Sequence, residues 1–139
     1  MTRRLTRRTD QYSSGRRITP PISDGGSTNN SRPLFGLSLV QREFDVPDCS
    51  EAFRADVLAG LRERSQLSWA QLDTTPHRGL GAERIPRTQI KAPIPPAVTE
   101  DVEKFVVFRI GNPGRVIGFR TGATFEAVWL DERHAVYEG

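Results

Sequence analysis

The sequence has few residues that form covalent or metal cross-links. Among its 139 residues there is one cysteine, Cys49, so no disulfide can form within the chain and no cysteine-based zinc cluster is possible. Its two histidines, His77 and His134, lie 57 residues apart, and Asp73 and Asp131 do not complete a set of metal ligands. We therefore expect neither a metal nor another cofactor, and a lone loop cysteine is usually inert.

Long apolar runs are also missing. No window approaches the roughly 18 continuous apolar residues that a membrane span needs. The arginine-rich start is not followed by the apolar core of a signal peptide. We therefore expect a cytoplasmic protein without a membrane partner.

Charge is divided unevenly along the chain. Residues 1–32 contain seven arginines against two aspartates, whereas the remainder has 13 basic and 15 acidic residues. Residues 1–33 are otherwise mostly small, polar or proline, so we expect a disordered, arginine-rich tail. This tail is either an arm that contacts RNA or the ribosome through phosphates, or a solvated or wrongly assigned leader without a role.

Residues 34–139 are long enough for a single domain with its own core. The alternation of residues 34–44 predicts a first strand. Ser50 is expected to cap a helix through about Arg64, with Phe53, Val57, Leu58 and Leu61 on its apolar face. Ser68 and Gln71 fit a capping box for a shorter helix over residues 67–72. Two glycines and four prolines in residues 77–96 predict an ordered loop with one or two brief edge strands.

The last third of the chain, residues 104–139, has three apolar runs separated by glycine-bearing turns. Residues 104–110, 115–120 and 123–130 are therefore predicted to form an antiparallel meander, with Phe125 and Trp129 on one face of the last strand. A strand, two helices and then several strands predict an α+β fold with the helices on one face of an antiparallel sheet.

This order of elements, with "GRVIGFR" in the middle strand and "H-x-V-Y" at the end, resembles the RelE and HigB superfamily of bacterial toxins. The blocks "SW-x-Q-L-x-x-x-P-x-R-G-L-G" at 68–81, "IPR", "IKAPIPP" and "GFR…VWLD…VY" are similar to a prophage-borne branch of it. The resemblance covers roughly residues 34–139. It implies a RelE-like toxin of a type II toxin-antitoxin pair, which cuts messenger RNA without a metal, typically on the ribosome, and is neutralised by a cognate antitoxin.

The resemblance also assigns the catalytic groups, residue by residue. It implies one basic residue before the first turn of the meander, an arginine at the start of the next strand, and a basic group or histidine and then a tyrosine after the last strand. These positions are Arg109, Arg115, Arg133, His134 and Tyr137. Two departures stand out: Gly114 precedes the arginine where the family has a tyrosine, and Asp131 lies where a basic residue is common.

Metal-independent RNA cleavage needs a base for the 2′-OH, cations for the charge on phosphorus, and an acid for the leaving oxygen. His134 or Tyr137 can exchange protons, and the arginines can hold phosphate oxygens through their planar fork. Further RNA contacts are expected from His77, Arg78, Lys91 and Arg120.

Each candidate also has a non-catalytic alternative. Arg109, Arg115 and Arg120 can be solvent-facing residues of a sheet with one exposed face, paired with Glu126. His134 can be an ordinary surface histidine, and Tyr137 can anchor the C-terminus. The alternative function is a non-catalytic prophage protein of the same fold that binds a protein or nucleic acid, an interpretation favoured by Asp131 and by the acidic balance after residue 33. A third possibility is nucleic-acid binding through the arginine-rich tail.

Overall fold

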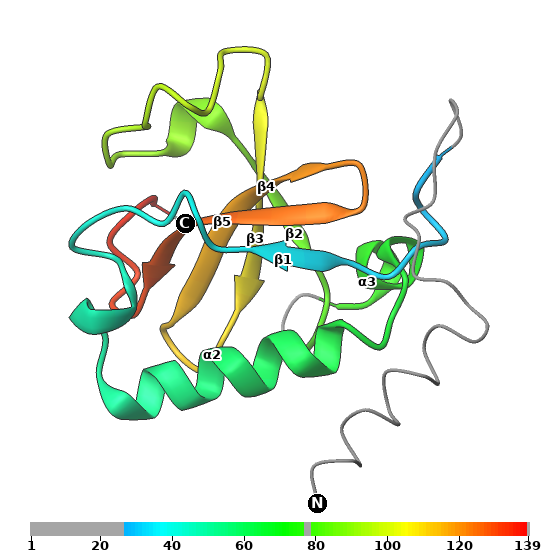
Figure 1. The fold of residues 1–139 in the computed structure, drawn as a ribbon, viewed down its shortest axis with the longest axis horizontal. Helices are drawn as coiled ribbons and strands as arrows, with labels where there is room; N and C mark the ends of the chain where they lie inside the picture. Colours follow the sequence, from blue (N-terminus) through cyan, green and yellow to red (C-terminus); the bar gives the residue numbers. More distant parts are fainter. Residues whose placement is uncertain (1–26, 77–78, 139) are drawn as a thin grey trace, which may run out of the picture.

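The computed structural model describes residues 27–76 and 79–138, so residues 1–26, His77, Arg78 and Gly139 lie outside the described part. Most of the expected tail and two of the expected RNA contacts therefore have no described position. The described part is an α+β fold with a five-stranded sheet and two α-helices (Figure 1). No helix in this part is long and apolar enough to cross a membrane.

The sheet is mixed rather than purely antiparallel. Its strands are β1 (Leu34–Gly36), β2 (Glu83–Pro86), β3 (Lys104–Arg109), β4 (Arg115–Thr121) and β5 (Thr124–Asp131), in the order β1-β5-β4-β3-β2. The predicted meander is confirmed, because β3, β4 and β5 pair antiparallel in succession. The first strand is shorter than residues 34–44, and it pairs parallel with β5 at the edge of the sheet.

Both helices begin at the predicted caps. Ser50 Oγ accepts a hydrogen bond from Phe53 N at the start of α2 (Glu51–Arg64). Ser68 and Gln71 form the expected capping box of α3 (Trp69–Thr74). One detail was wrong: Leu58 is 73% exposed, because it lies about 100° around the helix from the buried Val57.

A shift of register in the last hairpin also corrects the predicted faces of β5. The pairing between β4 and β5 shifts at Gly118, where a Cβ would lie 2.0 Å from the carbonyl oxygen of Glu126. Such a bulge moves the following side chains to the opposite face of the strand. Phe125 therefore packs with the helices, whereas Trp129, expected beside it, packs on the other side of the sheet.

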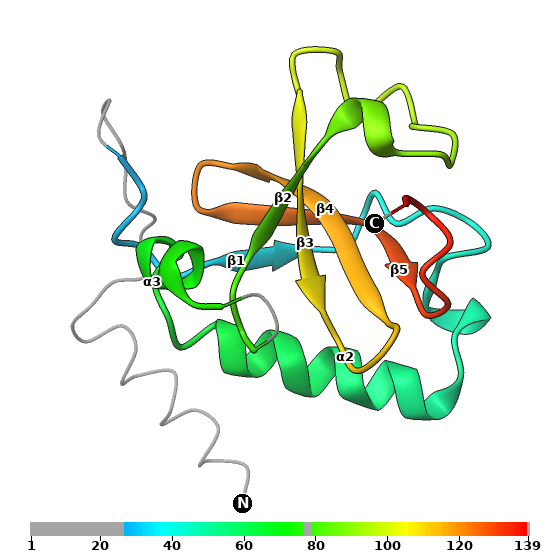
Figure 2. The same cartoon turned by 180° about the vertical axis from the view of Figure 1, so that it is seen from behind.

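The sheet has a hydrophobic core on each face. The helix face packs against α2 and α3, and its core includes Trp69, Phe108 and Phe125. The other face, called the loop face here, packs against the irregular residues 87–103 and 132–138, as Figures 1 and 2 show from opposite sides. Its buried residues include Phe105 and Trp129. The alternative of a sheet with one solvent-exposed face was therefore wrong.

Two arginines organise the irregular backbone beside the cores. Arg87, in the short 3-10 helix Arg87–Gln89, donates hydrogen bonds to the carbonyls of Val98, Thr99 and Val102 at 2.7–3.2 Å. Arg64, at the end of α2, donates to the carbonyls of Gly60, Gly79 and Arg109 at 3.0–3.2 Å. Side-chain donors thus supply hydrogen bonds to backbone carbonyls of the loops and of the ends of regular elements.

Candidate functional site

Four residues named by the sequence meet at one end of the sheet. In the strand register, Arg115 at the start of β4 lies opposite Asp131 at the end of β5. The chain then turns back, and the segment 132–138 carries His134 and Tyr137 onto the loop face. The group Arg115, Asp131, His134 and Tyr137 is called the C-terminal cluster below.

Arg115 is the centre of this cluster. Its side chain is only 7% exposed. Nε donates a 3.1 Å hydrogen bond to Tyr137 Oη, and Nη1 donates to the carbonyls of Pro113 and Gly114 at 2.8 and 3.1 Å. Among the residues that the structure describes, Nε and Nη1 are the nitrogens of Arg115 that donate hydrogen bonds.

His134 and Tyr137 lie against each other. Their ring centroids are 4.7 Å apart, with an angle of 54° between the ring planes. His134 has a φ of 60°, in the left-handed region that side chains other than glycine adopt uncommonly. Tyr137 is buried, and its oxygen accepts the hydrogen bond from Arg115, so the phenol proton is left for a different acceptor.

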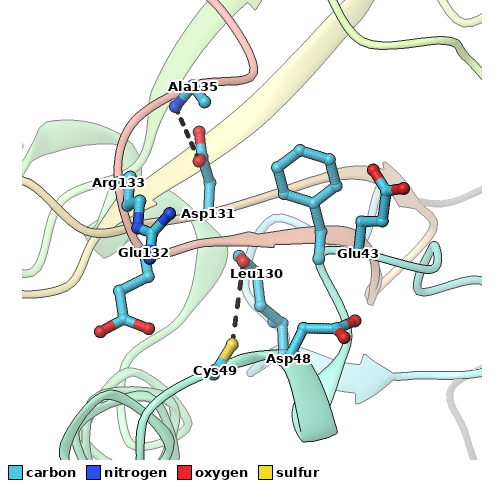
Figure 3. Close-up of a pocket in the computed structure, with 9 residues that line it drawn as sticks. Glu43, Asp48, Cys49, Leu130, Asp131, Glu132, Arg133 and Ala135 are labelled. Atoms are coloured by element: carbon cyan, nitrogen blue, oxygen red, sulfur yellow. Dashed lines mark hydrogen bonds between the residues drawn. The ribbon is translucent and has the colours of Figure 1, made fainter.

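Asp131 is the most buried polar member of the cluster, at 1% exposure. Oδ1 accepts from the backbone N of Ala135 and Oδ2 from that of Val136, both at 2.8 Å; the first bond is drawn in Figure 3. Sequence reasoning treated this residue as a departure from a family pattern and rejected it as a metal ligand, but it did not predict its role in the turn. The available signal was an aspartate directly after an apolar strand and before a turn, where its side chain can accept hydrogen bonds from the backbone that follows.

Arg133 is the exposed cation next to the cluster, and it lines two adjoining hollows together with Glu132. The first hollow, of about 260 Å³, is shown in Figure 3 and is also lined by Glu43, Asp48 and Asp131. The second, of about 420 Å³, lies between the first turns of α2 and the turn 111–114, and it adds Asp56. The lining therefore carries more carboxylates than cations.

Ser50 and Glu132 connect the start of α2 to the segment after β5. Glu132 Oε1 accepts from Ser50 N at 2.9 Å, and Oε2 accepts from Ser50 Oγ at 2.7 Å. These hydrogen bonds hold the pKa of Glu132 below its ordinary value. Cys49, one residue earlier, is buried, and burial raises the pKa of its thiol, with the Glu132 and Asp48 carboxylates adding to this effect. The neutral thiol agrees with the expectation of an inert cysteine.

The other candidates do not join the cluster. Arg109 lies opposite Arg115 in the strand register, but its Nε pairs with Glu83 Oε1 on β2 at 3.3 Å. Lys91 forms an exposed ion pair with Glu138 at 3.5 Å. Arg109, one of the expected catalytic cations, is therefore paired with Glu83 instead of joining the C-terminal cluster.

Arg120 lies at the opposite end of β4 from Arg115. Its guanidinium lies 4.5 Å from the centroid of the Trp69 ring and donates to Thr28 Oγ1 and Asn29 Oδ1 at 2.7 and 3.0 Å. Burial lowers the pKa of Arg120. Its Nε donates to the carbonyl of Gly122 at 2.8 Å, and within the described residues it forms no hydrogen bond with the expected partner, Glu126. The observed contacts of Arg120 therefore connect residues 28 and 29 to the domain.

Comparisons with known proteins give no independent assignment. Within residues 27–76 and 79–138, no group of three or more His, Cys, Asp or Glu side chains is arranged to hold a metal ion. No protein-family model, no curated protein and no solved structure matches the chain.

Proposed function

We propose that this chain is a metal-independent endoribonuclease of the RelE-like toxin type, with its active site at the C-terminal cluster. The observation that carries the proposal is the meeting of Arg115, His134 and Tyr137. The Arg115 Nε to Tyr137 Oη distance is 3.1 Å, and the His134 ring lies against the tyrosine ring. These residues come from β4 and from the chain end, and they are three of the five catalytic positions that the resemblance implies.

The chemistry follows from the positions of the donors. Arg115 Nε donates a hydrogen bond to the phenol oxygen and so holds it in place, and Tyr137 exchanges a proton with the 2′-OH in the proposed reaction. Nη2 of Arg115, which donates no hydrogen bond to the described residues, can bind a phosphate oxygen as negative charge develops on phosphorus. His134, the partly exposed member, is positioned to return a proton to the leaving oxygen. RNA therefore approaches from the side of His134 and Arg133.

The fold and the partners are part of the same proposal. The element order of one strand, two helices and an antiparallel set of strands supports a RelE-like domain over residues 34–139. Its partners are messenger RNA, read on the ribosome or free, and a cognate antitoxin. The edge strand β1 offers the antitoxin an open sheet edge beside Leu34 and Leu37, both exposed.

A second candidate function is a non-catalytic prophage protein of the same fold that acts by binding a partner. Two observations favour it. Arg115 uses Nη1 for two backbone carbonyls, as a structural arginine does. The hollows beside Arg133 carry more carboxylates than cations, and carboxylates repel the phosphates of RNA.

Tightly induced expression in a bacterial host, with transcripts mapped for new 5′ ends, separates the two candidates. We expect growth arrest with cleaved messages. Tyr137→Phe keeps the ring and removes the hydroxyl, and His134→Asn keeps a residue that tolerates positive φ. Either change should reduce cleavage by the purified full chain about 100-fold or more. Arg62→Ala, which removes an exposed charge on α2, is the matched control and should cleave normally.

Two results contradict the proposal. If the folded Tyr137→Phe and His134→Asn variants cleave as the parent does, the site is elsewhere. If the folded parent neither arrests growth nor cleaves RNA, with or without ribosomes, the binding protein becomes the better interpretation.

A further inference from the structure

The turn after β5 is closed by one side chain. The backbone N–H groups of Ala135 and Val136 both point at the carboxylate of Asp131, at 2.8 Å, and His134 N lies 3.4 Å from the carbonyl oxygen of the same residue. Three successive amides therefore converge on Asp131. We propose that Asp131 is a positioning residue that sets the placement of His134 and Tyr137 against Arg115, an inference that rests on the proposed function.

The backbone of His134 shows why such a device is needed. At a φ of 60° this residue occupies a region that is unfavourable for a residue other than glycine and that persists only where the surroundings impose it. The hydrogen bonds to Asp131 lie on the residue itself and on the two that follow it. These hydrogen bonds hold the turn of the chain after β5, and this turn places the His134 ring against Tyr137.

A carboxylate suits this task better than an amide. The two amides use different oxygens of Asp131, and an asparagine has a single acceptor oxygen. Arg115 lies opposite Asp131 in the strand register, yet its described hydrogen bonds go to Tyr137 and to two backbone carbonyls. The buried negative charge is thus balanced mainly by backbone donors, as carboxylates at helix caps are.

The other end of the segment is fixed independently. The backbone of Tyr137 forms an isolated antiparallel β-bridge with that of Ile90, and Lys91 N donates to the carbonyl of Val136 at 2.7 Å. The segment is therefore held at Asp131 on one side and by residues 90 and 91 on the other. Between these two points, Tyr137 Oη meets Arg115 Nε. The hydrogen bonds described for Asp131 come from backbone N–H groups, so its proposed role is to hold the geometry.

The first test needs no variant. Amide hydrogen exchange of the folded full chain, followed by NMR, should show Ala135 and Val136 exchanging at least about 100-fold more slowly than an unstructured peptide. The carboxylate is the acceptor that the structure shows for each of these two amides. Exchange of both amides at the rate of an unstructured peptide in folded protein would overturn the proposal, whether or not the chain cleaves RNA.

The second test separates positioning from general stability. In Asp131→Asn we expect faster exchange at Ala135 or Val136 and a smaller ring-current shift of the His134 ring protons. The kcat for RNA cleavage should fall about 10- to 100-fold with little change in KM. Glu132→Gln is the control, because it also replaces a carboxylate by an amide at the adjacent position. It should keep the exchange rates of both amides and the ring-current shift of the parent.

The outcomes distinguish the two proposals. A parent protein with protected amides but no cleavage contradicts the ribonuclease and leaves Asp131 as the residue that positions His134 and Tyr137. A folded Asp131→Asn variant with unchanged exchange, ring shift and kcat contradicts the positioning role. If that variant does not fold, exchange in the parent decides whether the carboxylate holds the turn.

Discussion

Each face of the sheet carries a buried core, but the two cores are covered by very different kinds of structure. The helix face is closed by α2 and α3, two capped helices, whereas the loop face is closed by residues 87–103 and 132–138, which have little regular structure. Phe108 on the first face and Trp129 on the second are both almost completely buried. An irregular cover can therefore complete a core, provided that side chains such as Arg87 and Asp131 satisfy its backbone groups.

The largest expected effects test whether the core on the loop face stabilises the fold as much as the core on the helix face. Phe108→Ala and Trp129→Ala should each lower the free energy of unfolding by about 3–5 kcal/mol, because both leave a cavity in close-packed surroundings. Urea unfolding of the full chain, followed by circular dichroism, measures both. Leu58→Ala, on the exposed side of α2, is the control and should change stability by less than about 0.5 kcal/mol. A loss below about 1 kcal/mol for Trp129→Ala would mean that the loop cover opens readily.

The helix face was largely predictable from the sequence because its signals are local. Ser50 and Ser68 begin the two helices through hydrogen bonds to residues three positions ahead. The strands of the meander are separated by short turns, so their pairing follows from the chain order. The loop face gives no such signal. Its cover contains many prolines and sparse apolar residues such as Ile90 and Ile94. That composition predicted an ordered loop with one or two brief edge strands, of which β2 is one, but it did not predict a cover for a second core.

The candidate site was predictable in part for the same reason. Arg115, His134 and Tyr137 were named from short motifs, and the structure brings them together. Arg109 was named equally but pairs with Glu83, a residue on a strand whose partner the sequence does not reveal. The bulge in β5 opposite Gly118 could not be anticipated either, since it depends on how β4 and β5 fit against each other. It places Trp129 on the loop face.

Effects of intermediate size are expected at Arg64 and Arg87, the arginines that donate hydrogen bonds to backbone carbonyls beside the helix face and the loop face. Their loss should lower the free energy of unfolding by different amounts. Arg64 is 2% exposed, and its guanidinium lies 5.1 Å from the centroid of the Phe108 ring. Arg64→Met leaves buried carbonyls without a donor and should cost about 2–3 kcal/mol. Arg87 is partly exposed, so water can replace its hydrogen bonds, and Arg87→Met should cost only about 1 kcal/mol.

Urea unfolding of both variants checks this order. Arg62→Met, an exposed position on α2, is the control for adding a methionine. A larger loss for Arg87→Met than for Arg64→Met would show that the loop cover depends on its arginine more than the helix side does.

The smallest expected effect concerns the contact that joins the two covers, from Ser50 at the start of α2 to Glu132 after β5. Hydrogen bonds from Ser50 N and Oγ lower the pKa of Glu132 below its ordinary value of 4.5. A lowered folded-state pKa means that the unfolded chain binds the proton more readily. The stabilising contribution is therefore complete above the ordinary pKa and is lost as the pH falls through the lowered one.

Glu132→Gln removes this titration, so the unfolding free energy of the variant should fall less steeply with acid than that of the parent from about pH 4.5 downward. Urea unfolding at a series of pH values measures the difference, and Glu51→Gln makes the same charge change at an exposed position of α2. Parallel pH profiles for the parent and Glu132→Gln would mean that the contact does not form in solution. The helix cover and the loop cover would then be linked only through the sheet between them.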